Sequence, residues 1–445
     1  MCEVKLLAQL RSYAEHDAAF WSFKDHTAKQ NDTAYFQYPA MMVPQMQGKI
    51  LAALQIASPN DLDLFDPFVG SGTTLVEGMK LGYRFEGHDV NPLAILLCRV
   101  KIGPYDSDAI TAATERVIAR FDKDTSTACE IDYHNTNKWY SPGALLYLSR
   151  LRRAIEKEEA TWTRRYLWVC MAEAARLASN TRTSTYKLHM RATSDITLRE
   201  PLTSDIILSC LRRNLALYIG NCQGFKKLGC LKGANYRKRA AVYVRDARVA
   251  GHPEGTPSKV DVVVTSPPYG DNNTTVTYGQ HSFLPLLWIP SHDIGEDVDN
   301  NYLCSTHEID HRCLGGSHAG ALDKASRLID LSISFKATLE KIPKDNEDAR
   351  KRLSAFYFDV DECLRTCTGR LKRGGFMLWT VGNRRVGGVQ VPMNQIVPEL
   401  FEHHGVVLVH ELSRAIYSKR MASRNKNAAT MTEETLLVLR KVKSE

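Results

Sequence analysis

The chain has 445 residues, enough to bury a full hydrophobic core and to hold two domains or one enlarged domain with an insertion. Apolar residues make up 44% and charged residues 24%, as in ordinary globular proteins, which excludes a mostly disordered chain. The net charge of +8 favours a polyanionic partner such as nucleic acid.

The cysteines and the apolar runs indicate the cellular compartment. The eleven cysteines are scattered without a paired framework, and the first residues lack the charged-then-apolar pattern of a signal peptide. No uninterrupted apolar run approaches the length that spans a membrane. We therefore expect a cytoplasmic protein that has reduced cysteines and no membrane segment.

The first hundred residues alternate helices and strands. Apolar residues recur at helical spacing, β-rich runs interrupt them, and Asn91-Pro92 opens a further helix. This order predicts an α/β fold with a doubly wound, mostly parallel sheet. The predicted elements are helices at 5–20, 46–56 and 73–81 and strands at 62–66 and 85–89.

The rest of the chain interrupts and then completes this sheet. We predict three parts: 1–105, N-terminal helices and the cofactor-binding half of the core; 106–239, a basic helical insertion; and 240–445, the catalytic half, with a loop-rich insert at about 271–346. The later predicted elements are helices at 145–155, 166–177, 206–217 and 353–371 and strands at 241–246, 260–265, 374–381, 405–409 and 435–439.

The string Asp66-Pro-Phe-Val-Gly-Ser-Gly-Thr-Thr74 lies between a predicted strand and helix. Gly70 and Gly72 let the backbone approach a ligand, although a tight turn in another α/β protein would look the same. Asp89 ends the next strand, where an acidic side chain hydrogen-bonds ribose hydroxyls in nucleotide-binding folds. Asp89 could instead cap the following helix.

The string Thr265-Ser-Pro-Pro-Tyr269 directly follows a predicted buried strand. Its prolines fix an extended backbone and remove N–H donors, which leaves carbonyls free to accept hydrogen bonds. Methylation of a base amino group needs such acceptors, because they favour the pyramidal nitrogen that attacks the methyl group. We assign them to the Ser266 hydroxyl and the Pro267 carbonyl, with Tyr269 stacked on a flipped base. Disordered and SH3-binding tracts carry the same tetrapeptide but lack the preceding strand.

Together with Gly87-His-Asp-Val-Asn-Pro92, the two strings resemble the S-adenosylmethionine-dependent DNA amino-methyltransferases. The resemblance covers about 25–105 and 240–443, and it implies a Rossmann-like class I methyltransferase core that uses S-adenosyl-L-methionine and acts on double-stranded DNA. It implies cofactor contacts from Tyr38, Pro39, Asp66, Pro67, Phe68, Gly70, Ser71, Gly72, Thr73, Thr74, Asp89, Asn91, Asp246 and Ala247, and a catalytic site of Ser266, Pro267, Pro268 and Tyr269.

Further segments resemble the same family. His26 with Gln37-Tyr-Pro-Ala40 is similar to the segment that closes over the methionine moiety, and Asp246 to the residue that takes the cofactor's adenine amino group. Gly374-Gly375, and Lys419-Arg-Met421 ahead of Thr432-Glu-Glu434, are similar to the terminal part of cytosine-N4 enzymes.

Ser266 stands where adenine-N6 enzymes usually have Asp, so the resemblance implies a site-specific cytosine-N4 methyltransferase of a restriction-modification or related system. Such a system implies a cognate restriction endonuclease as a partner, whereas the sequence gives no oligomeric state. Adenine N6, or RNA, stays open as the target, and so does a catalytically silent DNA-binding subunit that keeps the fold.

The DNA-reading segment is not fixed, because the cofactor string precedes the catalytic string, the reverse of many Ser-Pro-Pro-Tyr enzymes. The stretch 180–189 mixes hydroxyls, cations and an aromatic ring, as base and phosphate contacts require, although a solvated capping loop has the same composition. The stretch 271–346 competes for this role. The DNA-binding candidates are Asn180, Arg182, Thr183, Ser184, Lys187, Lys419 and Arg420.

Four potential metal ligands lie close together in the predicted loop-rich insert. They are Cys304, His307, His311 and Cys313. Their spacing is crowded and fits no zinc module, so we expect no metal.

Overall fold

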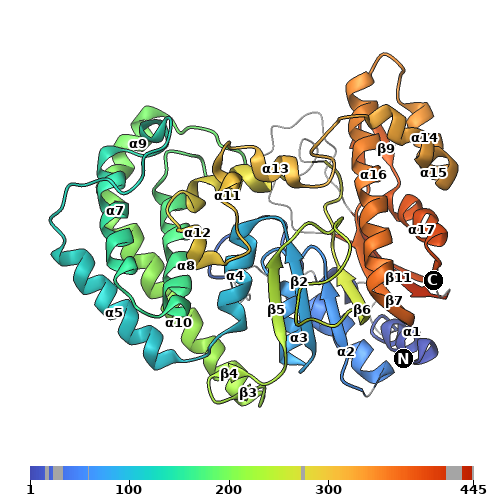
Figure 1. The fold of residues 1–445 in the computed structure, drawn as a ribbon, viewed down its shortest axis with the longest axis horizontal. Helices are drawn as coiled ribbons and strands as arrows, with labels where there is room; N and C mark the ends of the chain where they lie inside the picture. Colours follow the sequence, from blue (N-terminus) through green and yellow to red (C-terminus); the bar gives the residue numbers. More distant parts are fainter. Residues whose placement is uncertain (16–19, 24–33, 59, 272–275, 417–432, 443–445) are drawn as a thin grey trace.

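A seven-stranded sheet forms the centre of the molecule in the computed structural model, which describes residues 1–15, 20–23, 34–58, 60–271, 276–416 and 433–442 (Figure 1). The strand order is β10-β11-β7-β6-β1-β2-β5. The strands are β1 (Asp63–Asp66), β2 (Arg84–Asp89), β5 (Ala240–Val244), β6 (Val260–Thr265), β7 (Leu371–Val381), β10 (Val406–Ala415) and β11 (Glu433–Lys441).

Strand directions show that the sheet is mostly parallel. The neighbours β1 and β2, β1 and β6, β2 and β5, and β6 and β7 pair in parallel, whereas β11 is antiparallel to both β7 and β10. Strand order reverses direction at β1, so the chain winds outward on both sides. The predicted doubly wound, mostly parallel α/β sheet is confirmed.

Both faces of the sheet are covered, which explains why side chains on both sides of its central strands β1 and β6 are buried. In β6, Val262 and Val264 face one core cluster and Val263 faces another. Helices α1 (Glu3–Ser12), α2 (Pro44–Ala57), α3 (Thr73–Lys80) and α4 (Pro92–Ile102) contribute to the first cluster, and α14 (Ala321–Leu331), α15 (Ile333–Lys341), α16 (Glu347–Arg370) and α17 (Met393–His403) to the second.

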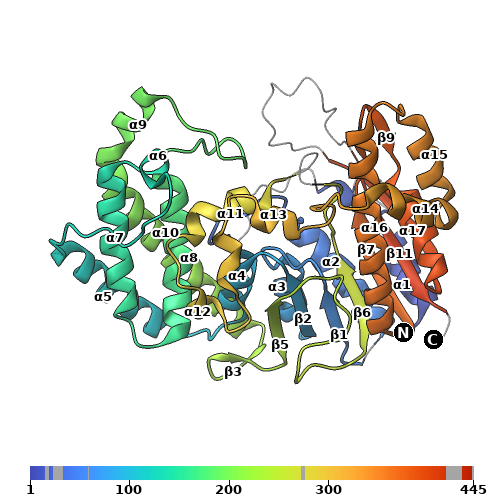
Figure 2. The same ribbon diagram turned by 45° about the horizontal axis from the view of Figure 1, so that its top comes forward.

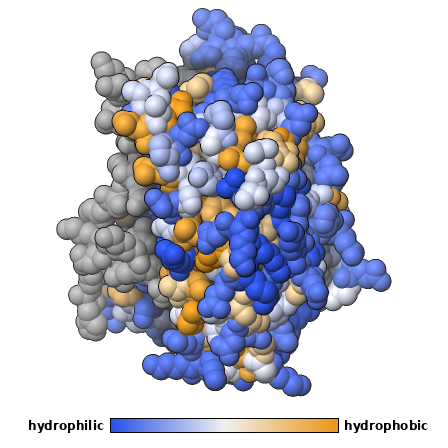
Figure 3. Space-filling view, turned by 90° about the vertical axis from the view of Figure 1, so that its left-hand side faces the viewer, coloured by the Kyte–Doolittle hydropathy of each residue, from blue (hydrophilic) through white to orange (hydrophobic). Residues whose placement is uncertain are grey.

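The segment between β2 and β5 forms a helical unit at the β5 edge of the sheet, on the left of Figures 1 and 2. The unit packs against α4 of the core. Its outer face, which is turned toward the viewer in Figure 3, is largely hydrophilic. Its elements are α5 (Ser107–Lys123), α6 (Thr136–Trp139), α7 (Pro142–Glu156), α8 (Thr161–Ala178), α9 (Thr193–Arg199), a 3-10 turn (Glu200–Leu202), α10 (Thr203–Lys227) and the hairpin β3 (Leu231–Lys232) and β4 (Asn235–Tyr236).

The expectation of a loop-rich insert at 271–346 is wrong for its described part. Short helices fill it despite the inner Pro285, because Phe283, Leu284 and Leu286 are buried, and α11 packs on α8. Besides α14 and α15, the elements there are α11 (Tyr278–Leu286), α12 (Ser291–Ile294), a 3-10 turn (Asn300–Leu303) and α13 (Glu308–Arg312); elsewhere the chain adds the 3-10 turn Phe20–Ser22 and the hairpin β8 (Arg384–Val386) and β9 (Val389–Val391).

Among the described helices, none is long and apolar enough to cross a membrane.

Candidate active site

The glycine-containing turn between β1 and α3 is fastened to the end of β2. Asp89 accepts hydrogen bonds from the Gly70 amide at 3.0 Å and the Asn91 amide at 2.8 Å. Gly70 and Gly72 have φ of +50° and +83°, a region that favours glycine. Burial raises the pKa of Asp89 to about 6. The cap of α4 is Asn91, which accepts from the Leu93 amide, and not Asp89.

Two side chains of α4 support this turn from beneath. The buried Lys101 ammonium donates to the Ser71 carbonyl at 2.6 Å, and the Cys98 thiol to the Gly70 carbonyl at 3.3 Å. Burial lowers the pKa of Lys101 to about 8. Because these carbonyls are bonded on the helix side, the other side of the turn stays available to a ligand.

Asp66 links the predicted cofactor string 66–74 to the predicted catalytic string 265–269. The Thr265 hydroxyl donates to its Oδ1 at 2.6 Å, and the Phe68 amide donates to the same oxygen at 3.0 Å. Burial raises the pKa of Asp66 to about 7. Asp66 was expected to contact the cofactor, but its side chain is fully buried and bonds to the strand that carries the second motif.

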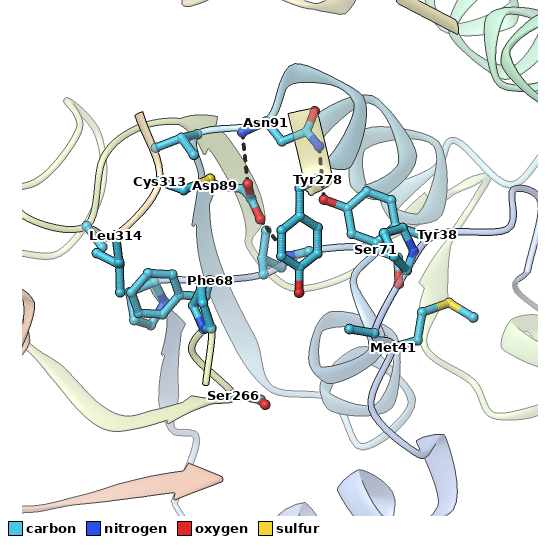
Figure 4. Close-up of a pocket in the computed structure, with 18 of the residues that line it drawn as sticks. Tyr38, Met41, Phe68, Ser71, Asp89, Asn91, Ser266, Tyr278, Cys313 and Leu314 are labelled. Atoms are coloured by element: carbon cyan, nitrogen blue, oxygen red, sulfur yellow. Dashed lines mark hydrogen bonds between the residues drawn. The ribbon is translucent and has the colours of Figure 1, made fainter. Parts of the chain in front are cut away.

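A cavity of about 830 Å³ opens over the turn, large enough for a ligand of nucleoside size (Figure 4). Asp89 and Asn91 lie at one side of it and Ser266 at the other. Of the expected cofactor residues, those that line it are Tyr38, Pro39, Pro67, Phe68, Gly70, Ser71, Thr73, Asp89, Asn91, Asp246 and Ala247; Asp66, Gly72 and Thr74 do not.

Asp246 is one of two acidic groups on this cavity. Its carboxylate pairs with the Arg248 guanidinium at 2.6 Å, and Arg248 in turn pairs with Asp359 at 2.7 Å. The Arg248 backbone amide also donates to Asp246 Oδ1 at 2.9 Å, and together these bonds fix the position of the Asp246 side chain.

The cavity also has walls that sequence reasoning missed. Tyr278, at the start of α11, stacks on Tyr38 with ring centroids 6.0 Å apart, and the Tyr38 hydroxyl accepts from the Asn91 amide group at 3.1 Å. No local signal marks Tyr278, since it lies in the stretch expected to be loops. The other missed lining residues include Met41, Met42, Arg245, Arg312, Cys313 and Leu314.

A second cavity of about 710 Å³ adjoins the first. Ser266, Pro268 and Tyr278 line both, whereas Pro267 and Tyr269 line the second alone. Its polar lining residues from the rest of the fold are Gln47, Thr380, Arg384, Arg414 and Glu434. The predicted catalytic string therefore forms part of the wall between two neighbouring cavities.

The hydroxyls of the catalytic string belong to a bonded chain. Ser266 Oγ and the Tyr269 hydroxyl lie 2.9 Å apart, and the Tyr269 hydroxyl donates to Glu434 Oε1 at 3.1 Å. Burial raises the pKa of Tyr269 well above its ordinary value. The ring of Tyr269 was expected to stack on a base, and its position in the wall of the second cavity allows this.

The predicted DNA-reading stretch divides into one buried residue and several exposed ones. Asn180 is 7% exposed, and its side chain donates to the Lys138 carbonyl at 3.1 Å, a bond within the protein. The following loop is tied to α11, because Gln280 accepts from the Leu188 amide at 3.2 Å. The exposed candidates are Arg182, Thr183, Ser184 and Lys187.

Some expected residues cannot be placed. His26, Lys419, Arg420, Met421 and Thr432 lie outside the described residues. Gly374 has φ of +73° within β7.

The rings of His307 and His311 stack with centroids 6.5 Å apart, but the two cysteines of 304–313 have different surroundings. Cys304 is exposed and donates to Glu308 at 3.5 Å, whereas Cys313 lines the first cavity. In the part of the chain that the structure describes, no group of three or more His, Cys, Asp or Glu side chains is placed to hold a metal ion.

The comparisons with known proteins give one full-length relative. The chain is 27% identical over 455 aligned residues to the Type II methyltransferase M.MvaI of Kocuria varians, which covers 98% of this chain and 96% of the relative. A shorter match, 46% identical over 43 residues, is to the Type II methyltransferase M.MjaII of Methanocaldococcus jannaschii and covers 10% of this chain and 8% of that protein. No family model matches.

Among solved structures, the rRNA methyltransferase aviRa from Streptomyces viridochromogenes covers 93% of this chain and 94% of its own, with 11% identity and a TM-score of 0.33. The strand order and directions of the sheet are those of a Rossmann-like class I methyltransferase fold.

Proposed function

We propose that this chain transfers the methyl group of S-adenosyl-L-methionine to the exocyclic N4 of cytosine in duplex DNA, at a specific site. The observation that carries this proposal is the position of Ser266, in the wall shared by two adjoining cavities. One cavity would hold the cofactor and the other a base flipped out of the duplex. The full-length likeness to a Type II methyltransferase supports a modification enzyme.

The first cavity suits the adenosyl part of the cofactor. The Asp89 carboxylate can accept hydrogen bonds from ribose hydroxyls, Asp246 can accept from the adenine amino group, and Phe68 offers an apolar ring beside them. When bound, S-adenosyl-L-methionine supplies a methyl group activated by the sulfonium. The residues of this chain would orient that methyl group toward Ser266, with Tyr38 and Tyr278 excluding water.

The second cavity suits the target base. The Ser266 hydroxyl and the Pro267 carbonyl would accept hydrogen bonds from the amino group, which favours attack by its nitrogen, and the Tyr269 ring would stack on the base. The proton released after transfer would leave through Ser266.

Arg384 supports cytosine over adenine. Arg384 lines the second cavity, and its Nε is buried with no hydrogen-bond partner among the described residues. Beside its amino group, cytosine presents two acceptors, N3 and O2, which match a guanidinium fork. Adenine presents only N1 and a C–H group there, so one buried donor would stay unpaired, which is costly.

Two alternatives remain distinct from this proposal. An adenine-N6 or RNA methyltransferase would share the fold and the first cavity but would not need the Arg384 donors. A silent DNA-binding subunit would not need Ser266. DNA contacts from Arg182, Thr183, Ser184, Lys187, Lys419 and Arg420, action in the cytoplasm and a cognate endonuclease partner belong to the proposal.

The test is transfer of tritiated methyl groups from S-adenosyl-L-methionine to duplex DNA of mixed sequence by the full-length protein. The wild type should label DNA, and Ser266→Ala should lower the rate by about 100-fold or more. Ser126→Ala, at an exposed position after α5, is the matched control and should keep the full rate. No labelling by the wild type, or full activity of Ser266→Ala, would overturn the proposal.

A further inference from the structure

We infer that Glu434 is a positioning residue and the final proton acceptor of the reaction: it orients the Ser266 hydroxyl through Tyr269 and receives the proton that the target amino group loses. This inference rests on the proposed function and deepens it. It concerns the link from the second motif to β11, which lies about 165 residues further along the chain in sequence.

Three side chains and one ion pair form the link. Ser266 Oγ lies 2.9 Å from the Tyr269 hydroxyl, which donates to Glu434 Oε1 at 3.1 Å. Arg414 binds the other carboxylate oxygen, with its Nε 2.8 Å from Glu434 Oε2. The Arg414 and Glu434 side chains are only 8% and 15% exposed, so solvent screens this pair weakly.

The ion pair fixes the direction of every hydrogen bond in the chain. An ionised carboxylate can only accept, so the Tyr269 hydroxyl must donate its single proton to Glu434. The Tyr269 oxygen can then only accept from Ser266. The Ser266 proton is therefore committed to Tyr269, and its lone pairs are left to accept from a base amino group in the cavity.

The same chain accounts for the proton. In the transfer, the target nitrogen forms a bond to the methyl carbon while the carbon–sulfur bond breaks and its electron pair goes to sulfur. The nitrogen then gives one proton to Ser266 Oγ, Ser266 passes its own proton to Tyr269, and Tyr269 passes its own to Glu434. Ser266 and Tyr269 therefore keep the same number of protons after the transfer, and Glu434 gains one and becomes a neutral carboxyl group.

The surroundings of Glu434 suit this role. Among the residues that the structure describes, the charged or titratable groups that face it are Tyr269 on the catalytic string, Arg414 on β10 and Arg384 on β8. A serine hydroxyl alone is a poor base, and the link gives it access to one.

Single-turnover methylation of DNA, with cofactor and DNA saturating, tests the inference. Glu434→Gln keeps an acceptor for Tyr269 but cannot take the proton at neutral pH, and Tyr269→Phe removes one hydroxyl while keeping the ring. Each should slow the step by about 100-fold without changing affinity for S-adenosylhomocysteine. The matched control is Glu433→Gln, which changes the exposed neighbour on β11 and should keep the wild-type rate.

Rescue by a conservative variant separates proton acceptance from a structural role. Glu434→Asp keeps a carboxylate, so it should transfer methyl groups faster than Glu434→Gln. The double variant should be no slower than the slower single variant, because both changes interrupt one chain.

Wild-type rates in Tyr269→Phe would overturn the inference even if Glu434→Gln failed to fold, and so would a rate of Glu434→Asp no higher than that of Glu434→Gln. These results differ from failure of the proposed function, in which the wild type itself would transfer no methyl group to DNA and the inference would fall with it.

Discussion

Replacing Thr265 with Val tests the bond that joins the two motifs. The change keeps the volume of the side chain and removes the hydroxyl that donates to Asp66 at 2.6 Å. Thr265 is 1% exposed and Asp66 0%, so water does not replace the lost donor. A hydrogen bond to a charged group contributes about 1.5–3 kcal/mol, and one between neutral groups about 0.5–1.5 kcal/mol.

The loss should depend on pH, because burial raises the pKa of Asp66 to about 7 from 3.8. Between these values the folded protein holds a proton that the unfolded chain has released, so the contribution of Asp66 to stability decreases as pH rises through this window. Above it, the buried carboxylate depends on its donors. Thr265→Val should therefore cost about 1.5–3 kcal/mol at about pH 8.5 and about 0.5–1.5 kcal/mol at about pH 5.5.

Urea unfolding at the two pH values measures this difference, provided that the slope of the transition is unchanged. Thr114→Val is the matched control: Thr114 is also 1% exposed, but it donates to the Ile110 carbonyl at 2.8 Å, which does not titrate. Its loss should be equal at both pH values. An equal loss for Thr265→Val, or none, would refute the reasoning.

Three further predictions concern the cavities and the turn. Asp89→Asn should weaken binding of S-adenosylhomocysteine by about tenfold. In the wild type, the affinity for S-adenosylhomocysteine should decrease below about pH 6, because Asp89, with its pKa raised to about 6, becomes protonated there. Asp89→Asn should not show this decrease. Calorimetry at two pH values would contradict the prediction if the affinities of both proteins changed alike. Arg384→Met should lower kcat/KM for DNA by about 10–100-fold while leaving cofactor affinity unchanged, and an unchanged kcat/KM would rule out a role in base recognition. Gly72→Ala should destabilise by about 1–2 kcal/mol or more in urea unfolding, since φ is +83° and a Cβ would lie 2.8 Å from the Cys98 sulfur. Gly224→Ala, with nothing within 4 Å, is its control and should gain about 0.5–1 kcal/mol; equal effects would contradict the prediction.

The sheet could be predicted because its signals are local. The run Val260–Thr265 is apolar apart from Asp261 and Thr265, as burial on both faces favours, and turn glycines mark where strands end. Asp89 and Ser266 were found for the same reason: Asp89 is the last residue of β2 and Ser266 directly follows β6, and both line the first cavity.

The helices of 276–346 could not be predicted, because their stability comes from contacts far away in the sequence. Gly279 is a poor helix residue in isolation, yet its amide bonds to the buried Asp310 at 2.8 Å. Tyr278 entered the site only through this packing, and Glu434 through the pairing of β11 with β7.

For Asp66, the sequence predicted the position in the fold but not the role of the side chain. The motif places it correctly at the end of β1, but sequence spacing does not reveal that its side chain turns toward Thr265. Asn180 differs likewise, since its bond to the Lys138 carbonyl depends on a helix far from it in sequence. In both cases local composition identified the segment, and tertiary contacts decided the role of the side chain.

The most direct test of the central claim is the identity of the methylated base. DNA treated with the purified full-length protein and S-adenosyl-L-methionine would be digested to nucleosides, and the products separated by mass spectrometry. The position of Ser266 and Arg384 in the second cavity predicts N4-methylcytosine. Finding only N6-methyladenine would contradict the account.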